Sequence, residues 1–161
     1  MFKFDTKKAA ENIESLIKEL FPIHRTLVNE GFERSLEIIY ELLPIEVKQV
    51  PSGKQVYDWI VPQSWNVEEA CIKTSSGKVL IDFQENNLRL SAYSQEFNGL
   101  ISHEELLQHL NCREDLQEAI PYNFHYYKKD WSFNVSYKEL NTLFTEKEYH
   151  VTIKTKVYDD F

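Results

Sequence analysis

The apolar positions in the first quarter of the chain recur at helical spacing. In the first segment they share one helix face: Ala9, Ile13, Leu16, Ile17 and Leu20. Asp5 or Thr6 is suited to cap this helix, which we expect to end near Leu20. After a polar turn at Asn29-Glu30-Gly31, a second helix continues to Pro44, which stops it. Two helices with a short connector predict a helical pair.

From Ile45 onward the periodicity changes from helical to strand-like. Strands are predicted at residues 45–50, 56–61, 70–74, 78–83 and 88–93, separated by short turns. Ser75-Ser76-Gly77 predicts a hairpin, because glycine accepts the positive φ of such turns. Short strands in succession predict an antiparallel meander or a barrel-like sheet.

The last third of the chain adds capped helices and a final strand. Ser102 with Glu105 is a capping box that predicts a helix ending near Asn111, and Ser136 with Glu139 predicts a further helical turn. From Tyr149 the apolar residues alternate with polar ones, and no strand is predicted after them. We therefore expect an unpaired edge here, unless another chain or a short strand covers it.

These elements predict an α+β fold with a helical segment at residues 1–44 and a mainly β region at residues 45–161. The sheet is expected to have about six to eight strands, with one capped helix laid on it. Since 42% of the residues are hydrophobic and 14% are aromatic, the chain can bury the core of one domain.

The densest pattern is Val56 to Asn66, which holds two tryptophans, an acid and a proline. In a strand from Val56 to Val61 that is apolar on both faces, Asp58 would be buried, so we expect it to be hydrogen-bonded. Two roles stay open for this carboxylate: a structural acid that ties down a loop, or a substrate-binding acid.

This stretch is part of a longer resemblance. The matching segments are Leu20-Phe21-Pro22-Ile23-His24-Arg25-Thr26-Leu27, Pro51-Ser52-Gly53, Asp58-Trp59-Ile60-Val61-Pro62, Trp65-Asn66, Ile81-Asp82-Phe83, Asn87-Leu88, Tyr93-Ser94, Ile120-Pro121-Tyr122, Tyr126-Tyr127 and Trp131-Ser132-Phe133. In this order and spacing they resemble the N-terminal part of a family of bacterial aminopeptidase-like proteins, often linked to polysaccharide biosynthesis loci. The family pattern has glycine and cysteine where this chain has Ser132 and Asn134.

The resemblance implies zinc peptidases with an α/β catalytic domain into which a smaller, mostly β domain is inserted. Their metal-binding histidine and aspartate motifs lie downstream of the matched region, so it implies no cofactor in this chain and zinc in the full-length family. The leading hypothesis is therefore a non-catalytic N-terminal region that shapes substrate access or oligomer contacts. Part of segment 1–44 would then belong to the peptidase-like domain, and its apolar surface would be covered by that domain or in a homo-oligomer.

Net charge, hydropathy and cysteine content limit the classes of binding partner and the cellular location that we expect for this chain. The net charge of −8 argues against a nucleic-acid surface, which needs clustered basic residues. There is no apolar run long enough for a membrane span and no signal sequence, so we expect a soluble cytoplasmic protein. Cys71 and Cys112, far apart and without CxxC partners, are expected to be free thiols.

Motifs for chemistry within the chain are incomplete. His103-Glu104-Glu105 begins like a zincin helix, yet Leu107 stands where the second histidine would be. Ser64 lacks a glycine-flanked elbow, and no pair of acids is marked out. Whether the chain is an enzyme stays open, and a self-contained hydrolase is the third hypothesis.

The second hypothesis is a stand-alone module for a sugar, a peptide or another small ligand. Aromatic rings stack on sugars, and arginine suits carboxylate or phosphate. Core packing is the alternative for the aromatic residues, and a buried ion pair to Asp58 or another acid is the alternative for His24 and Arg25. The candidate ligand-binding residues are His24, Arg25, Asp58, Trp59, Tyr93, Tyr122 and Tyr126.

Overall fold

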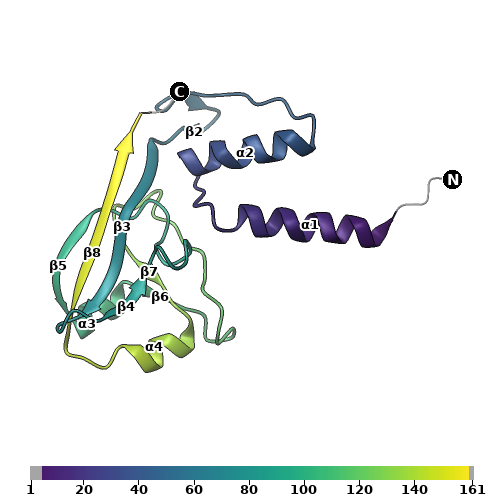
Figure 1. The fold of residues 1–161 in the computed structure, drawn as a ribbon. Coiled ribbons are helices and arrows are strands. Elements are labelled where there is room, and N and C mark those ends of the chain that lie inside the picture. The colour runs from purple at the N-terminus through teal and green to yellow at the C-terminus, as the bar shows by residue number, and fades with distance from the viewer. Residues whose placement is uncertain (1–4, 160–161) are drawn as a thin grey trace.

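A four-stranded antiparallel sheet forms the centre of the molecule (Figure 1). The computed structural model describes residues 5–159. The sheet order is β4-β3-β8-β5, and the strands are β3 (Ser64–Thr74), β4 (Val79–Asp82), β5 (Phe97–Ser102) and β8 (Glu148–Tyr158). Four helices accompany the sheet, so the α+β class expected from the pattern is confirmed.

The β3–β4 hairpin forms where the turn signal predicts it. Gly77 has φ +89°, and the Gly77 N–H donates to Thr74 O at 2.9 Å. The backbone N–H of Thr74 closes the turn by donating to Lys78 O at 2.8 Å. Glycine occupies this position without the steric cost that a Cβ would add at positive φ.

The last strand, β8, is central in the sheet, so the expected free edge is wrong for its first half. β8 pairs with β3 from Ser64 to Thr74 on one side, and with β5 from Phe97 to Ser102 on the other. Tyr149, Val151 and Ile153 are consequently buried, none more than 1% exposed. Both partners lie far upstream in the chain, and such non-local pairing leaves no local signal in the sequence.

Two expected strands are absent from the described residues, and a third is a hairpin. Residues 45–50 are irregular, and residues 88–93 contribute only isolated bridges at Leu90 and Ala92. The stretch 56–61 folds into β1 (Gln55–Val56) and β2 (Trp59–Ile60), which pair with each other. The expected meander is therefore wrong, and so is the expected sheet of six to eight strands, because the largest sheet in the described residues has four.

Asp58 lies in the turn of this hairpin and is exposed, so its expected burial is wrong. Tyr57, beside it, has φ +56° and is 93% exposed. The alternating apolar pattern across Val56 to Val61 arises from two short strands with a tight turn between them. A period-2 pattern does not distinguish this arrangement from one continuous strand.

Both N-terminal helices are confirmed, but they do not form a buried pair. They are α1 (Thr6–Leu20), capped by Asp5, and α2 (Glu30–Leu42), capped by Asn29. No residue of α1 is buried, and α2 buries only Ser35 and Ile38. None of the helices in residues 5–159 is long and apolar enough to cross a membrane.

Short elements close one face of the sheet. They are α3 (His103–Gln108), β6 (Leu110–Asn111), β7 (Phe133–Asn134) and α4 (Tyr137–Leu143). The Ser136–Glu139 capping box is present. At Ser102 only half of the expected box forms: the side chain accepts from the Glu105 N–H, without the reciprocal contact from the Glu105 side chain. However, α3 ends at Gln108 rather than near Asn111, because the next residues pair in parallel with β7.

The core fills the space between the sheet and these short elements. Its fully buried members include Ile72, Leu106, Phe133, Val135 and Tyr149. Burying a side chain of this size stabilises the fold by about 1.5–3 kcal/mol each. The N-terminal segment is tied to this body by backbone contacts, such as Trp65 N–H donating to Val28 O at 3.1 Å. The division at residue 44 stays a prediction.

Candidate functional site

The loop before α2 is held by a buried asparagine. The Asn29 side-chain oxygen accepts from the N–H of Phe32 at 2.9 Å and from that of Thr26 at 3.2 Å. Its amide donates to His24 O at 3.0 Å. A Cβ added at Gly31 would lie 1.9 Å from that same carbonyl oxygen, so glycine is required there. Together these contacts fix the position of His24.

His24 is a neutral aromatic neighbour of the core. Its ring meets Trp65 edge-on at 5.4 Å and Phe83 at 4.9 Å, measured between ring centroids. Burial lowers the pKa of His24 from 6.5 to about 4, because the charged form loses its hydration. At neutral pH the His24 side chain is therefore uncharged and does not attract an anion electrostatically.

Three of the candidate ligand residues share a small cavity. His24, Arg25 and Tyr122 line a space of about 190 Å³ together with apolar side chains such as Leu90. Arg25 donates from Nη1 to Leu20 O at 2.5 Å, and no ion pair joins Arg25 to Asp58 among the described residues. Arg25 is the only charged residue in this lining.

Asp58 and Trp59 lie apart from the other candidates. Both belong to the β1–β2 hairpin, with Asp58 exposed and Trp59 half-buried. Neither residue lines the cavity around His24 or the groove around Tyr93. The seven candidates are therefore divided among three places, and their ligand-binding role stays a prediction.

Tyr93 and Tyr126 line a wider groove of about 820 Å³ beside the end of β8. Tyr93 adopts φ +60°, an uncommon conformation for a residue with a side chain, and its hydroxyl donates to Gln63 O at 3.1 Å. The Tyr126 hydroxyl is buried without a hydrogen-bond partner among the described residues. Desolvation, and next the neighbouring Tyr93, raise the pKa of Tyr126.

The ring faces in this groove are largely occupied by one another. Tyr93 is stacked between Trp65, at a centroid distance of 5.5 Å, and Tyr126, at 4.5 Å. A sugar ring needs an open aromatic face, and two other rings already stack on Tyr93. This geometry favours the core-packing alternative for Tyr93, while the edges and hydroxyls of the rings still border the groove.

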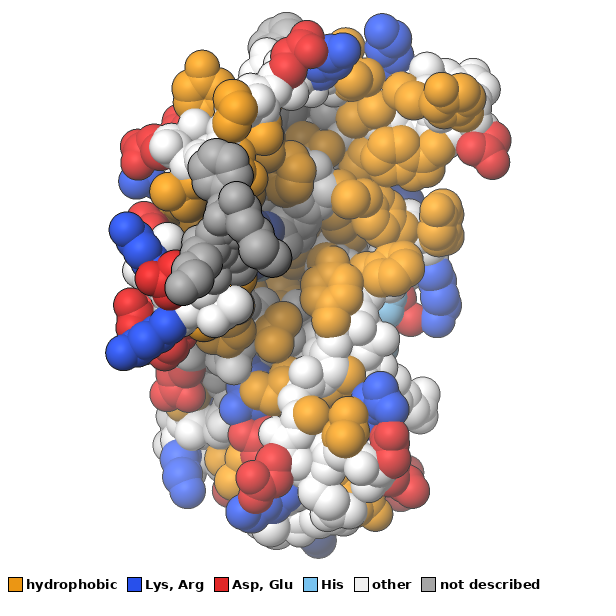
Figure 2. All heavy atoms as spheres, turned by 90° about the vertical axis from the view of Figure 1, so that its right-hand side faces the viewer, with side chains coloured by type: hydrophobic (Ala, Val, Ile, Leu, Met, Phe, Trp, Pro, Cys, Tyr) orange, Lys and Arg blue, Asp and Glu red, His pale blue; other side chains and the backbone are white. Residues whose placement is uncertain are grey.

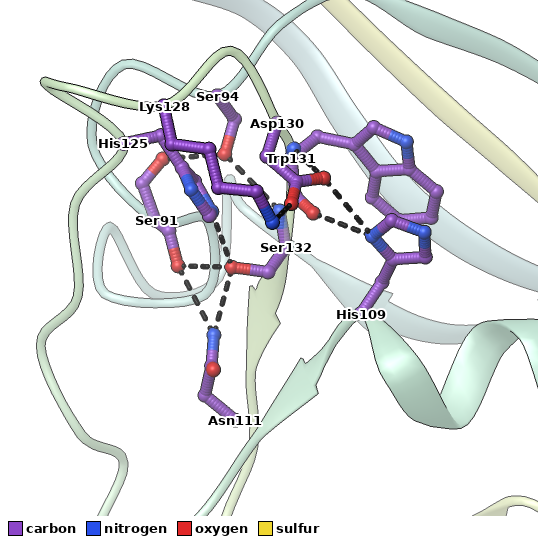
Figure 3. Close-up of polar contacts among 9 residues, drawn as sticks. All are labelled: Ser91, Ser94, His109, Asn111, His125, Lys128, Asp130, Trp131 and Ser132. Atoms are coloured by element: carbon purple, nitrogen blue, oxygen red, sulfur yellow. Dashed lines mark hydrogen bonds and ion pairs between the residues drawn. The ribbon is translucent and has the colours of Figure 1, made fainter.

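A buried polar cluster joins the loops behind the groove (Figure 3). We call it the Ser–Asn cluster, and its members are Ser91, Ser94, Asn111, Asn123, His125, Ser132 and Asn134. Ser132 Oγ lies 2.7 Å from Ser91 Oγ, 2.8 Å from His125 Nε2 and 2.7 Å from Asn111 Nδ2. Asn134 Oδ1 accepts from Ser91 Oγ at 3.1 Å and from Asn111 Nδ2 at 3.2 Å. They add to backbone hydrogen bonds between the same segments, such as Ser91 N–H donating to Ser132 O at 3.0 Å.

Next to the cluster, His109 is positioned by Trp131. The two rings stack at 3.8 Å, and His109 Nδ1 donates to Trp131 O at 2.7 Å. Asp130 lies 3.6 Å from the same nitrogen and pairs with Lys128 at 2.6 Å. Figure 3 shows the His109 and Trp131 rings on one side of Ser132, and Ser91, Asn111 and His125 on the other.

The Ser132–His125 pair has hydrogen-bond geometry that a nucleophilic serine needs, yet the surroundings favour a structural role. Ser132 is only 4% exposed, and its hydroxyl is already engaged by three partners. Burial lowers the pKa of His125, which keeps the ring neutral. Ser132 also lines none of the cavities described above.

Metal ligands are not assembled in this part of the protein. Residues 5–159 contain no group of three or more His, Cys, Asp or Glu side chains that could hold a metal ion. The side chains present therefore do not fit a zinc ion. Cys71 and Cys112 are both free, as expected from their spacing.

Sequence reasoning did not identify the Ser–Asn cluster or the role of Trp65 in the aromatic stack. Two signals pointed there: Ser132 and Asn134 depart from the family pattern, and both prove to be central to the cluster. Small polar residues scattered over four separate segments of the chain carry no periodicity, so only the fold brings them together.

Comparisons with known proteins agree with the resemblance seen in the sequence. Residues 64–156 match the family model described as "Domain of unknown function (DUF2172)". The chain is 34% identical over 155 residues to a Clostridium acetobutylicum protein named "Putative polysaccharide biosynthesis protein with aminopeptidase-like domain". This match covers 96% of the present chain and 36% of the relative.

A solved structure gives the same result for the fold. It is described as a "putative peptidase" from Clostridium acetobutylicum, with a TM-score of 0.86 and 34% identity, covering 94% of this chain and 36% of that one. The chain thus spans about a third of the length of the relatives it matches. The family match extends over more than half of the chain, and the chain therefore belongs to the DUF2172 family and is related, over nearly its whole length, to a protein named for an aminopeptidase-like domain.

Proposed function

We propose that this chain is the non-catalytic N-terminal region of an aminopeptidase-like zinc peptidase, and that it docks on the peptidase domain and shapes substrate access. The observation that carries the proposal is an apolar groove of about 540 Å³ between α2 and residues 47–50. We call it the helical groove, and its exposed apolar members are Leu27, Phe32, Tyr40, Val47 and Val50.

Exposed apolar surface of this extent is uncommon on a monomer and typical of an interface. Phe32 is 41% exposed and Tyr40 is 62% exposed, and in α1 the apolar residues Ile13 and Ile17 are exposed as well. Figure 2 shows hydrophobic side chains gathered on the upper half of this face, toward the end that carries α1 and α2.

The proposed occupant is the remainder of the relatives' polypeptide. The relatives are much longer than the matched region, which is only 36% of their length. A domain supplied in the same polypeptide would cover the groove permanently. It would also supply the zinc ligands, for which the described residues provide no donor set. The chemistry of peptide hydrolysis is assigned to that domain.

The test combines this chain with the part of the Clostridium acetobutylicum relative that lies beyond the match. We expect the two polypeptides to copurify and the complex to contain zinc by elemental analysis. Hydrolysis of aminoacyl reporter substrates should depend on the complex. The present chain alone should bind no stoichiometric zinc and should release no reporter.

A charged substitution in the groove provides the specific control. Phe32→Glu places a carboxylate among apolar side chains and should abolish copurification. Leu100→Glu, at a 56% exposed apolar position on β5, should leave copurification unchanged. Stoichiometric zinc with turnover by the 161-residue chain alone would overturn the proposal.

A further inference from the structure

The second half of β8 has a partner on one side only. From Lys154 to Tyr158 it pairs with β3, whereas its pairing with β5 ends at Ile153 and Phe97. Figure 1 shows β8 continuing past the end of β5. The edge expected from the sequence is thus present, but it is limited to these few residues. An open edge is a template for another strand.

The backbone groups on this edge belong to Thr155 and Val157. In a strand, the N–H and C=O groups of alternate residues point to the same side. The N–H of Thr155 points away from β3, because it donates to the Glu96 carboxylate at 3.1 Å. By alternation, Val157 directs its backbone to the same side. Glu96 therefore occupies the position that the carbonyl of a neighbouring strand would take.

A groove runs along this edge. Thr155, Val157, Glu96, Tyr126 and Lys129 all contribute to the lining of the 820 Å³ groove. Val157 is 53% exposed, and Glu96 makes no ion pair with another described residue. Space, an apolar side chain, an unpaired carboxylate and open backbone groups are thus found together at one place.

We propose that an extended peptide segment carrying a lysine or arginine binds here as an added strand on β8. Its backbone carbonyl replaces the Glu96 carboxylate on the Thr155 N–H, and the released carboxylate pairs with the cation of the peptide. Main-chain hydrogen bonds to an edge strand supply affinity in this mode, and side-chain contacts supply selectivity.

The charges favour such a peptide over a second copy of this chain. Pairing two copies of β8 would release two Glu96 carboxylates. Both lysines in this half of the strand are engaged, which leaves Lys129 of the groove lining to receive the carboxylate in each copy. Lys154 is held by Glu69 at 2.6 Å, and Lys156 is held by Glu68 at 2.9 Å. The net charge of −8 further favours a basic ligand. The inference goes beyond the proposed function, and its test needs no peptidase domain.

The experiment uses the 161-residue chain and the peptide Ac-Thr-Val-Lys-Val-Thr-Val-amide. Nitrogen-15 NMR should show shifts of the Thr155 and Val157 amides on peptide addition, and calorimetry gives the Kd. A matched peptide with glutamine in place of lysine should bind roughly fivefold more weakly, because it cannot form the charge-assisted contact. That difference should vanish in Glu96→Gln.

Variants of Thr155 separate strand pairing from nonspecific contact. Thr155→Pro removes the N–H at an edge position where proline is tolerated, and should weaken binding roughly tenfold. Thr155→Ala keeps the N–H and should bind like the original chain. The amide shifts in the unmodified chain provide a readout that does not depend on the folding of any variant.

Three results would overturn the proposal. The first is the absence of amide shifts at Thr155 and Val157 at millimolar peptide. The second is binding that is equal in Thr155→Pro and Thr155→Ala when both are folded. The third is a concentration-dependent dimer that Thr155→Pro abolishes, with no peptide binding, which would assign the edge to a second copy. Failure of the copurification test, in contrast, would leave these measurements unaffected.

Discussion

Arg89 and Glu139 form a bidentate ion pair that links the loop containing residue 89 to α4. Arg89 Nη1 and Nη2 donate to the two carboxylate oxygens of Glu139 at 2.7 and 2.6 Å. The same carboxylate accepts from the N–H and Oγ of Ser136, completing the capping box. The side chains of Arg89 and Glu139 are only 13% and 26% exposed. The Glu139 carboxylate thus stabilises both the N-terminus of α4 and the loop at residue 89.

Neutralising this acid should destabilise the fold. We expect Glu139→Gln to lower the free energy of unfolding by about 2 kcal/mol, the magnitude of hydrogen bonds to charged groups. Urea denaturation at neutral pH measures the change. Glu118→Gln, which removes an exposed ion pair with Lys138, should cost less than about 1 kcal/mol. Equal effects of the two substitutions would contradict the assigned importance of Glu139.

The same pair predicts a stability change in acid. The Arg89 hydrogen bonds lower the pKa of Glu139 from 4.5 to about 2. Because this pKa is depressed in the folded state, its contribution is present above pH 4.5 and is lost as the pH falls toward 2. Urea midpoints between pH 5 and pH 2 should therefore fall less steeply in Glu139→Gln than in the original chain.

The lowered pKa of His24 predicts that the stability of the fold also depends on pH in a less acidic range. Its pKa is lowered to about 4 in the folded chain, whereas the unfolded chain protonates it near 6.5. Between these values the unfolded state binds more protons, so stability is full above pH 6.5 and declines as the pH falls toward 4. His24→Asn should flatten this part of the stability profile. An NMR titration that places the His24 pKa near 6.5 would refute the assignment.

Gly31 provides a test of the loop before α2. Exchanging glycine for alanine inside a helix normally stabilises it by about 1 kcal/mol. At Gly31 the added methyl group would collide with His24 O, so we expect a loss of at least about 2 kcal/mol instead. Gly99→Ala, where the nearest atom is a Phe97 ring carbon at 3.4 Å, serves as the control. A gain in the free energy of unfolding on Gly31→Ala would contradict the close contact with His24 O, and a loss would support it.

Removing the central hydroxyl of the Ser–Asn cluster should loosen several loops at once. Ser132→Ala leaves His125 and Asn111 without this partner, and a buried unsatisfied group costs about 1–3 kcal/mol. Asn141→Ala, which loses only an exposed bond to Tyr137 O, should stay within about 0.5 kcal/mol. Thermal or urea unfolding measures both. Unchanged stability in Ser132→Ala would show that the cluster does not hold the loops.

Local signals predicted the parts of this fold that are local. The caps at Asp5, Ser102 and Ser136 and the turn at Gly77 each act within a few residues, and all were found where expected. The path of residues 84–96 and the central place of β8 were not predictable, because they depend on partners that are distant in the sequence.

The candidate site was predictable only in part for a similar reason. Aromatic side chains were identified as a group, and Tyr93 with Tyr126 do meet in the structure. Their separation from Trp59 and Tyr122 follows from the hairpin at Tyr57 and from the loop around residue 122. Whether an aromatic ring offers a free face depends on its neighbours in space, on which spacing along the chain carries no information.

The strand order β4-β3-β8-β5 also sets the order of events during synthesis. β3 and β5 do not pair with each other, and the strand that joins them is synthesised after both. Until β8 is available, the β3–β4 hairpin is the only paired part of the central sheet. Completion of the sheet must wait for a long-range pairing step, which is slow and leaves apolar surface open to chaperones or to aggregation. A ribosome stalled before residue 148 would therefore carry an unfinished sheet, whatever the stability of the complete protein.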